Sequence, residues 1–221
     1  MTISKVVTLG PGDVPAVVAV LGAAFRDYPV MRYVLGTNQD RDGLRRLVAF
    51  FVQARALRGE TLLGVRGARG LLAAGLVSNS PSGPSPGALQ DLRDATWDYL
   101  GADARRRYER FGAAAGPFVS AVPHLHLNMI GVLPEARGRG LARIILDRVH
   151  QMSAEDPGSV GVSLSTEVEN NVSLYQHFGY ERTGFAVVDD AFTTWAMFRP
   201  DAPSVPGPTS GSIVPIDERP S

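Results

Sequence analysis

The apolar residues of this chain recur in two spacings, one typical of helices and the other typical of strands. A spacing of three to four residues predicts helices over about 13–26, 41–58, 88–111, 141–152 and 171–178. Alternating or β-branched stretches predict strands over about 3–9, 61–65, 71–77, 124–132, 160–166, 181–188 and 192–198. The pattern therefore predicts a mixed α/β domain, with a central sheet of about seven strands flanked by helices.

Two further segments have no place in that sheet. Residues 78–123 contain the expected helix 88–111 between irregular stretches rich in Pro, Ser and Gly, so we interpret them as a helical insertion between two strands. Residues 200–221 are rich in Pro and Ser and offer almost nothing to bury, which predicts a disordered tail. The expected domain therefore spans residues 1–199.

Composition narrows the class of protein. The 22 basic and 22 acidic residues give a formal net charge of zero, so no long-range field favours nucleic acid or an anionic membrane. The chain has no cysteine, which excludes disulfides, thiolate metal sites and cysteine nucleophiles, and we expect no metal. No apolar run reaches the roughly 18 residues of a membrane span, and the N-terminus lacks the features of a signal peptide. We expect a cytoplasmic protein, and the use of Arg in place of Lys, with Lys5 the only lysine, indicates a GC-rich, bacterial genome.

The segment 130–142 carries the most informative motif. An expected strand runs into a glycine-containing turn, which opens directly into an amphipathic helix. The first N–H groups of a helix have no partner within it and lie at the positive end of its dipole. Gly138 and Gly140 leave room for a pyrophosphate to approach these groups, and Arg137 and Arg139 add charge. The alternative is a tight turn with solvated arginines.

Other phosphate-binding or nucleic-acid-binding motifs do not match this turn. A dinucleotide-binding fingerprint requires glycine at the position of Arg143, and a P-loop requires Gly-Lys followed by Ser or Thr. One Arg-Gly-Arg-Gly is too short for an RNA-binding tract. A nucleotide-binding oxidoreductase or kinase is therefore the least favoured function.

A second motif follows the expected strand 160–166. Asn171 and Tyr175 are four residues apart, so they share one face of the expected short helix. On that face the Tyr175 phenol would be available as a proton donor. The alternative is a core tyrosine whose hydroxyl is satisfied by the protein.

Together the two motifs resemble those of the GNAT superfamily of N-acetyltransferases. The family's acetyl-CoA motif, Arg/Gln-x-x-Gly-x-Gly/Ala, is matched by Arg137, Gly140 and Ala142, and its Asn-x-x-x-Tyr-x-x-x-Gly-Phe/Tyr signature by Asn171, Tyr175, Gly179 and Tyr180. The order of the expected elements also fits the family along nearly the whole chain. The resemblance implies a GNAT fold, with a mostly antiparallel sheet, a splayed parallel pair of strands, and a helical insertion before the acetyl-CoA strand.

The resemblance also implies a cofactor site for acetyl-CoA. The strand around residues 130–132 would pair through its backbone with the pantetheine arm, and the turn would hold the pyrophosphate. Asn171 would fix the reacting end, and Tyr175 would return a proton to the departing thiolate. The implied cofactor-binding residues are Ile130, Val132, Arg137, Gly138, Arg139, Gly140, Leu141, Ala142, Asn171 and Tyr175.

The sequence leaves the general base open among several residues. His124, His126 and Asn128 share one face of their expected strand because of its period of two. Histidine titrates near neutral pH, and His124-Leu125-His126 resembles the His-x-His of arylalkylamine acetyltransferases. Glu167, acting through water, is a further candidate. For both histidines the alternative is a structural role.

Within the superfamily the chain is most similar in appearance to the group of puromycin N-acetyltransferase and its relatives. That likeness rests on residues 12–15 and 27–29 of the opening helix and on the place of the insertion. Relatives often carry Leu-Glu-Thr at the end of the strand that here contains Ser165, and a serine does not replace that carboxylate as a base. The likeness therefore leaves the acceptor undefined.

We expect an acetyl-CoA-dependent N-acetyltransferase, a monomer or homodimer, that acetylates the amine of a small molecule by direct attack on the thioester. An antibiotic, a polyamine-like metabolite or an arylalkylamine is compatible with the sequence. The alternative of a different class is a non-catalytic acyl-CoA-binding module that regulates a partner. Neither a nucleic acid nor a membrane is an expected partner.

Overall fold

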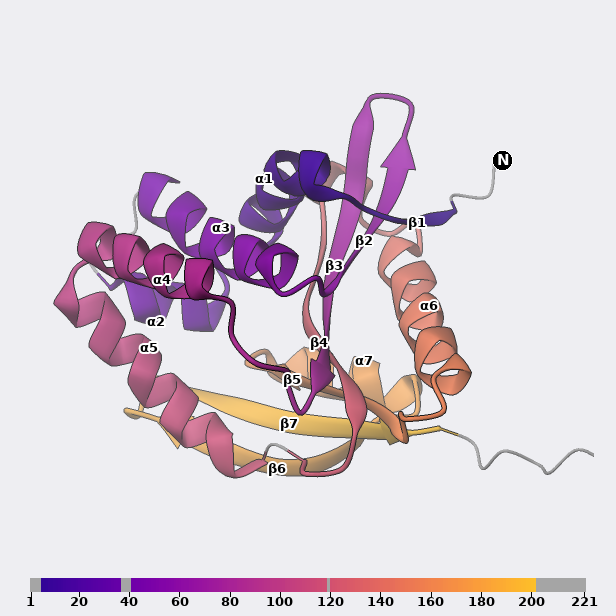
Figure 1. Cartoon of the computed structure of the whole chain (residues 1–221). Coiled ribbons are helices and arrows are strands. Elements are labelled where there is room, and N and C mark those ends of the chain that lie inside the picture. The colour runs from indigo at the N-terminus through magenta and orange to yellow at the C-terminus, as the bar shows by residue number, and fades with distance from the viewer. Residues whose placement is uncertain (1–4, 37–40, 119, 202–221) are drawn as a thin grey trace, which may run out of the picture.

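The computed structural model describes residues 5–36, 41–118 and 120–201, and one sheet runs through its centre (Figure 1). The sheet has seven strands in the order β1-β2-β3-β4-β5-β7-β6. The strands are β1 (Val6–Thr8), β2 (Thr61–Gly67), β3 (Gly70–Ser80), β4 (His124–Val132), β5 (Gly161–Thr166), β6 (Glu181–Val188) and β7 (Phe192–Pro200). Every neighbouring pair is antiparallel except β4 and β5, which are parallel, so the expected fold class is confirmed.

The parallel pair separates partway along its length. The β4–β5 ladder joins residues 125–127 of β4 to residues 162–164 of β5. By contrast, the β3–β4 ladder extends from His124 to Val132. The part of β4 beyond Leu127 therefore has no paired strand on its β5 side among the described residues, and the sheet opens there.

Helices cover both faces of this sheet (Figure 1). One face carries α1 (Val14–Ala24), α2 (Pro29–Leu35), α3 (Arg41–Leu57), α4 (Gly87–Leu100) and α5 (Ala102–Ala115), and the other carries α6 (Leu141–Glu155) and α7 (Glu169–His177). Short 3-10 turns are η1 (Pro11–Asp13), η2 (Gly116–Phe118) and η3 (Pro134–Ala136). The core is divided accordingly, with one buried cluster around Val17 and Leu47 and another around Ile145 and Val162.

Several boundaries differ from the expectation or add detail to it. The opening helix ends before residues 27–29 as expected, and Pro29 then begins a further helix, α2, because proline is tolerated in the first turn, where its missing N–H is not needed. The insertion contains two helices where we expected one, since Gly101 takes a φ of +88° and ends α4. β7 continues to Pro200, one residue past the expected domain, and the expected tail after Asp201 lies outside the described residues.

No single helix of the described ranges is both long and apolar enough to cross a membrane. The segments Pro11–Ala24 and Pro29–Leu35 reach that length and composition only as a pair bent by 99°. Both segments contribute buried residues to the core, among them Leu21 and Val34.

Gly131 determines how closely α1 approaches β4. A Cβ atom at Gly131 would lie 2.8 Å from Ala24 Cβ and 2.9 Å from Leu21 Cδ2. Because a packed interior resists additional atoms, we expect Gly131→Ala to lower the free energy of unfolding by about 1–3 kcal/mol, as measured by urea denaturation. Gly112→Ala is the matched control, since a Cβ there meets no atom within 4 Å. Equal stability of Gly131→Ala and wild type would contradict this close packing.

Candidate active site

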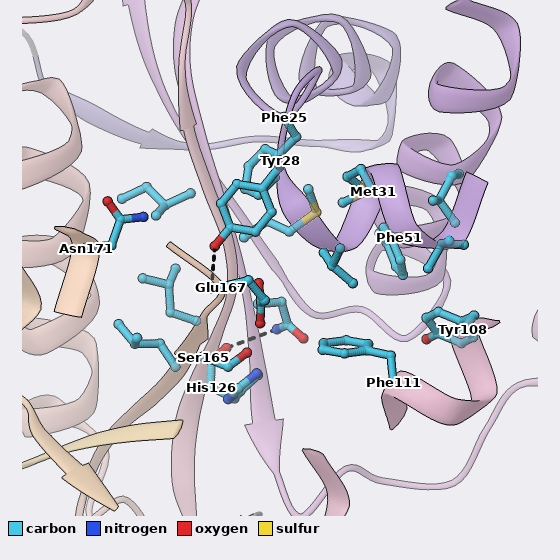
Figure 2. A pocket seen from close by; sticks show the side chains of 18 of the residues that line it. Phe25, Tyr28, Met31, Phe51, Tyr108, Phe111, His126, Ser165, Glu167 and Asn171 are labelled. Carbon is cyan, nitrogen blue, oxygen red and sulfur yellow. Dashed lines mark hydrogen bonds between the residues drawn. The ribbon is translucent and has the colours of Figure 1, made fainter. Parts of the chain in front are cut away.

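A cavity of about 220 Å³ lies where the sheet opens (Figure 2). One side is formed by β4, the end of β5 and α7, and the other by α2, α3 and α5. The side of β4, β5 and α7 supplies most of the polar lining groups, which are His126, Asn128, Ser165, Glu167, Asn171 and Tyr175. The opposite side is apolar and aromatic apart from Arg55, so the two sides of the cavity differ in their chemistry.

A β-bulge in β4 shapes the polar side. Two consecutive residues of β3 pair with Met129 and Leu127, which leaves Asn128 as the extra residue of β4. Bulges re-aim the side chains around them. His126 and Asn128 both line the cavity as a result of this local geometry.

Arg55 projects from α3 to the same wall. Its Nη2 donates a hydrogen bond to Asn128 Oδ1, and its Nε lies 3.2 Å from Glu60 Oε2. Asn128 Nδ2 donates to Ser78 Oγ at 2.8 Å, which fixes the orientation of the amide. Burial lowers the pKa of the Arg55 guanidinium and Glu60 opposes that shift, so the side chain stays cationic at neutral pH.

His126 is held as a neutral ring. Its Nδ1 lies 2.7 Å from Ser163 Oγ. Burial lowers the pKa of His126 to about 4, and the nearby Arg55 and His124 add to the shift. At neutral pH the ring is therefore uncharged, and its proton affinity is poorly matched to deprotonating an alkylammonium group.

Glu167 follows β5 directly and points into the cavity (Figure 2). The residue is 8% exposed, and its Oε1 accepts a hydrogen bond of 2.7 Å from Thr194 Oγ1. Burial raises the pKa of the Glu167 carboxyl, while hydrogen bonds from Thr194 and Tyr28 oppose the shift. A carboxylate whose pKa is raised takes up a proton more readily, which makes Glu167 the stronger candidate base.

Tyr28 and Asn171 order the backbone around Glu167. The Tyr28 hydroxyl lies 3.1 Å from Thr166 Oγ1 and accepts a hydrogen bond of 3.2 Å from the Glu167 N–H. Asn171 Nδ2 donates to the same Thr166 Oγ1 at 3.2 Å. These bonds tie the end of β5 to the start of α7 and to the segment before α2.

Tyr175 projects from α7 and lines the cavity while only 8% exposed. Its hydroxyl makes no hydrogen bond within the part of the chain that the structure describes. Burial raises the pKa of Tyr175 to about 12, and the charge of Glu167 adds to the shift. The phenol is therefore protonated at neutral pH and free to donate into the cavity.

The open edge of β4 presents unpaired backbone groups. The Leu133 N–H donates to Leu72 O at 2.9 Å, so alternate residues of β4 direct their backbone groups to β3. Ile130 and Val132 then direct their N–H and C=O groups to the other side, where the β5 ladder has already ended. An extended ligand can pair with this edge as a strand would.

Two glycines shape the turn before α6. Gly138 and Gly140 have φ values of +74° and +73°, and a Cβ at either position would meet no atom within 4 Å. α6 begins at Leu141 without a side-chain cap, so its first N–H groups are left for a ligand. The turn therefore combines free donors with open space.

The other residues expected at this turn contribute in different ways. Arg137 and Arg26 line a neighbouring cavity of about 350 Å³, whereas Arg139 Nη2 donates to Glu135 O at 3.0 Å. The Leu141 side chain is buried in the core at 4% exposed, so only its backbone is available to a ligand. Ala142 continues the helix and is half-buried.

His124 lies apart from the other expected catalytic residues. Its Nδ1 is 2.6 Å from Val122 O, and its ring packs against Phe198 at 5.7 Å. His124 and His126 are two residues apart on β4 and share a face of the strand. The cavity begins at His126, however, and His124 does not line it. The expected residues that line the cavity are His126, Ile130, Glu167, Asn171 and Tyr175.

Several lining residues were not expected from the sequence, and three of them matter most to the site. Tyr28, Phe51 and Arg55 all lie in or beside helices that precede the insertion. Helical spacing marks Phe51 as a core residue and Arg55 as a solvated one, so no local pattern singles them out. No group of three or more His, Asp or Glu side chains in the described ranges is placed to hold a metal ion.

Comparison with known proteins finds a domain match over part of the chain and a shared fold over most of it. Residues 99–182 match the model of the acetyltransferase (GNAT) domain. A histone acetyltransferase HPA2 and related acetyltransferase from Corynebacterium glutamicum is 21% identical, with a TM-score of 0.65 over 91% of this chain and 99% of that one. Arylalkylamine N-acetyltransferase 2 from Aedes aegypti is 11% identical, with a TM-score of 0.65 over 91% and 100%. The C-terminal condensation domain of Ebony, in complex with beta-alanyl-dopamine, is 12% identical, with a TM-score of 0.68 over 90% and 100%. At these identities the structural likeness shows a shared fold.

Proposed function

We propose that this chain is an N-acetyltransferase that transfers acetyl from acetyl-CoA to the amine of a small molecule, and its match to the acetyltransferase (GNAT) domain over residues 99–182 supports this proposal. The observation that carries the proposal is the gap between β4 and β5, which opens onto the cavity lined by Glu167 and Tyr175. A free strand edge, a proton donor and a carboxylate converge at that gap. Each is a requirement of acyl transfer from a thioester to an amine.

The residues around the gap fit acetyl-CoA. The free edge at Ile130 and Val132 suits the amide groups of a pantetheine arm, and the N–H groups at the start of α6 suit a pyrophosphate. Arg137 adds positive charge beside that turn, and Asn171 lies at the inner end of the gap. Acetyl-CoA supplies the acetyl group, whose carbonyl carbon bonds to the amine nitrogen as its bond to sulfur breaks.

Three proton movements accompany this transfer. Glu167 takes the first proton that the acceptor ammonium loses, because its carboxyl has a raised pKa and faces the cavity. Tyr175 gives a proton to the departing sulfur, because its phenol is protonated at neutral pH, and the phenolate that remains takes the second proton from nitrogen as the amide forms. His126 stays neutral and contributes hydrogen bonding from the floor of the cavity. The attack is direct, with no nucleophilic side chain.

Release of free thiol tests the proposal. The purified protein is mixed with acetyl-CoA and a panel of aminonucleosides, aminoglycosides, arylalkylamines, polyamines and short peptides. Amine-dependent thiol release is the expected result. Binding of acetyl-CoA in calorimetry, with no release from any amine, would instead favour a non-catalytic acyl-CoA-binding module that regulates a partner.

The proposal includes the setting in which the enzyme works. We place it in the cytoplasm of a bacterium, as a monomer or homodimer without a metal, nucleic acid or membrane partner. A formal net charge of zero supports the absence of polyanionic partners. Light scattering during size-exclusion chromatography tests the oligomeric state.

Gly140→Ala is expected to weaken the binding of acetyl-CoA. Gly140 has a φ of +73°, and an L-residue in this conformation costs roughly 1–2 kcal/mol. Relief of that strain moves the N–H groups at the start of α6, so we expect the KM for acetyl-CoA to rise about tenfold while kcat changes little. Gly12→Ala is the control, because Gly12 has no positive φ and equally open space. An unchanged KM for Gly140→Ala would argue against pyrophosphate binding at this turn.

A further inference from the structure

The part of the cavity beyond Glu167 is walled by aromatic rings. Phe51 of α3 and Tyr108 and Phe111 of α5 line it. Figure 2 shows Tyr108 and Phe111 on one side of Glu167, with Phe51 above them. A group that enters from the reacting end therefore meets the faces and edges of these rings.

This aromatic wall is fixed from behind. The Tyr108 ring lies 5.0 Å from the ring of Trp97, which is 5% exposed, and 5.9 Å from Phe51. Phe111 lies 6.1 Å from Phe192 of β7. Because these side chains are already ordered by their neighbours, an apolar group gains contact with them at little entropic cost.

The same cavity carries few charges. Among the described lining residues, Glu167 is the only carboxylate and Arg55 is the only fixed cation. One carboxylate compensates one ammonium group. A second ammonium would be enclosed near Arg55 without a partner, which is strongly unfavourable. Polyamines and aminoglycosides, which carry several ammonium groups, therefore do not match this lining.

The volume of the cavity restricts the acceptor further. A dry cavity of about 150 Å³ engineered in another protein holds one benzene molecule. The 220 Å³ found here therefore accommodates one ring with a short linker, and further sugar rings would have to lie outside it.

From this wall, charge and volume we infer that the acceptor is a monoamine whose nitrogen is joined by a short linker to an aromatic or similarly bulky apolar group. The amine nitrogen lies at Glu167, and the apolar group lies against Phe111, Tyr108 and Phe51. The inference rests on the proposed function, because it assigns the acceptor of that same site.

A comparison of kcat/KM among single amines tests the inference. We expect kcat/KM for 2-phenylethylamine to exceed that for spermidine, for kanamycin and for an alanine-initiated tripeptide by at least about tenfold, since apolar contacts of this size are worth 10–200-fold in specificity. Calorimetry with CoA in place of acetyl-CoA measures amine binding without turnover. A preference for spermidine, kanamycin or the tripeptide would overturn the inference and leave the proposed function intact.

Phe111→Ala tests the wall directly. We expect this change to raise the KM for 2-phenylethylamine about tenfold and to leave the KM for acetyl-CoA unchanged. Tyr99→Ala is the matched control, because Tyr99 belongs to the same insertion but is 53% exposed and lies beneath the Arg46 guanidinium outside the cavity. Far-ultraviolet circular dichroism establishes that both variants are folded. Equal KM values for 2-phenylethylamine in Phe111→Ala and wild type would overturn the inference. If no amine were turned over and none bound in calorimetry, both the inference and the proposed function would fail.

Discussion

Replacing Tyr175 by Phe is expected to lower kcat about 100-fold and to leave the KM for acetyl-CoA nearly unchanged. The hydroxyl is the only group removed, and it has no hydrogen-bond partner within the described part of the chain. No buried partner is orphaned by the change, so the free energy of unfolding should stay the same or rise slightly. Steady-state kinetics and urea denaturation measure the two quantities.

Tyr180→Phe is the matched control, because the two tyrosine rings lie 5.7 Å apart and differ in their surroundings. The Tyr180 hydroxyl lies 3.0 Å from His150 Nε2, and the residue is 2% exposed and outside the cavity lining. Its loss should lower the free energy of unfolding by about 1 kcal/mol and leave kcat unchanged. Equal kcat losses in both variants would mean that Tyr175 supports the fold and does not donate a proton.

Local sequence patterns predicted the elements that form the proposed cofactor side of the site. β4 spans the residues that its apolar pattern indicated, and α6 begins directly after Gly140 as the glycine-containing turn required. Both depend on short-range rules, namely the period of two in a strand and the tolerance of glycine for a positive φ. These rules operate within a few residues, so the sequence contains all the information they need.

The acceptor side depends on contacts between distant segments. Arg55 reaches Asn128 across 73 positions, and Tyr28 reaches Thr166 across 138 positions. The bulge that leaves Asn128 unpaired is a property of the β3–β4 register and has no signature in β4 alone. The sequence therefore leaves the base open among His124, His126 and Glu167, and the proposal of Glu167 rests on burial and on position in the cavity.

Glu167→Gln is expected to lower kcat/KM about 100-fold without weakening the fold. Burial raises the pKa of Glu167 in the folded state, so ionisation at neutral pH favours unfolding. The stability that this group contributes is fully present below the pKa of the unfolded glutamate, about 4.3, and is lost as pH rises through the folded pKa. Glutamine does not ionise, and its Oε1 still accepts the hydrogen bond from Thr194. The midpoint of thermal unfolding at pH 7 should therefore be equal to or above that of wild type, and the difference should vanish near pH 4.

Thr194→Val tests whether the Glu167 carboxyl acts as a base or has a purely structural role. The Thr194 hydroxyl lowers the pKa of Glu167 by donating to Oε1 at 2.7 Å, and valine has nearly the same shape without that donor. If Glu167 must be ionised to accept the amine proton, the acid limb of the kcat/KM profile should move to higher pH in Thr194→Val, with the plateau retained. An acid limb that stays in place, together with full activity in Glu167→Gln, would transfer the role of base to His126. Because the pKa of His126 is lowered to about 4, that outcome would require the acceptor to bind with its amine already uncharged.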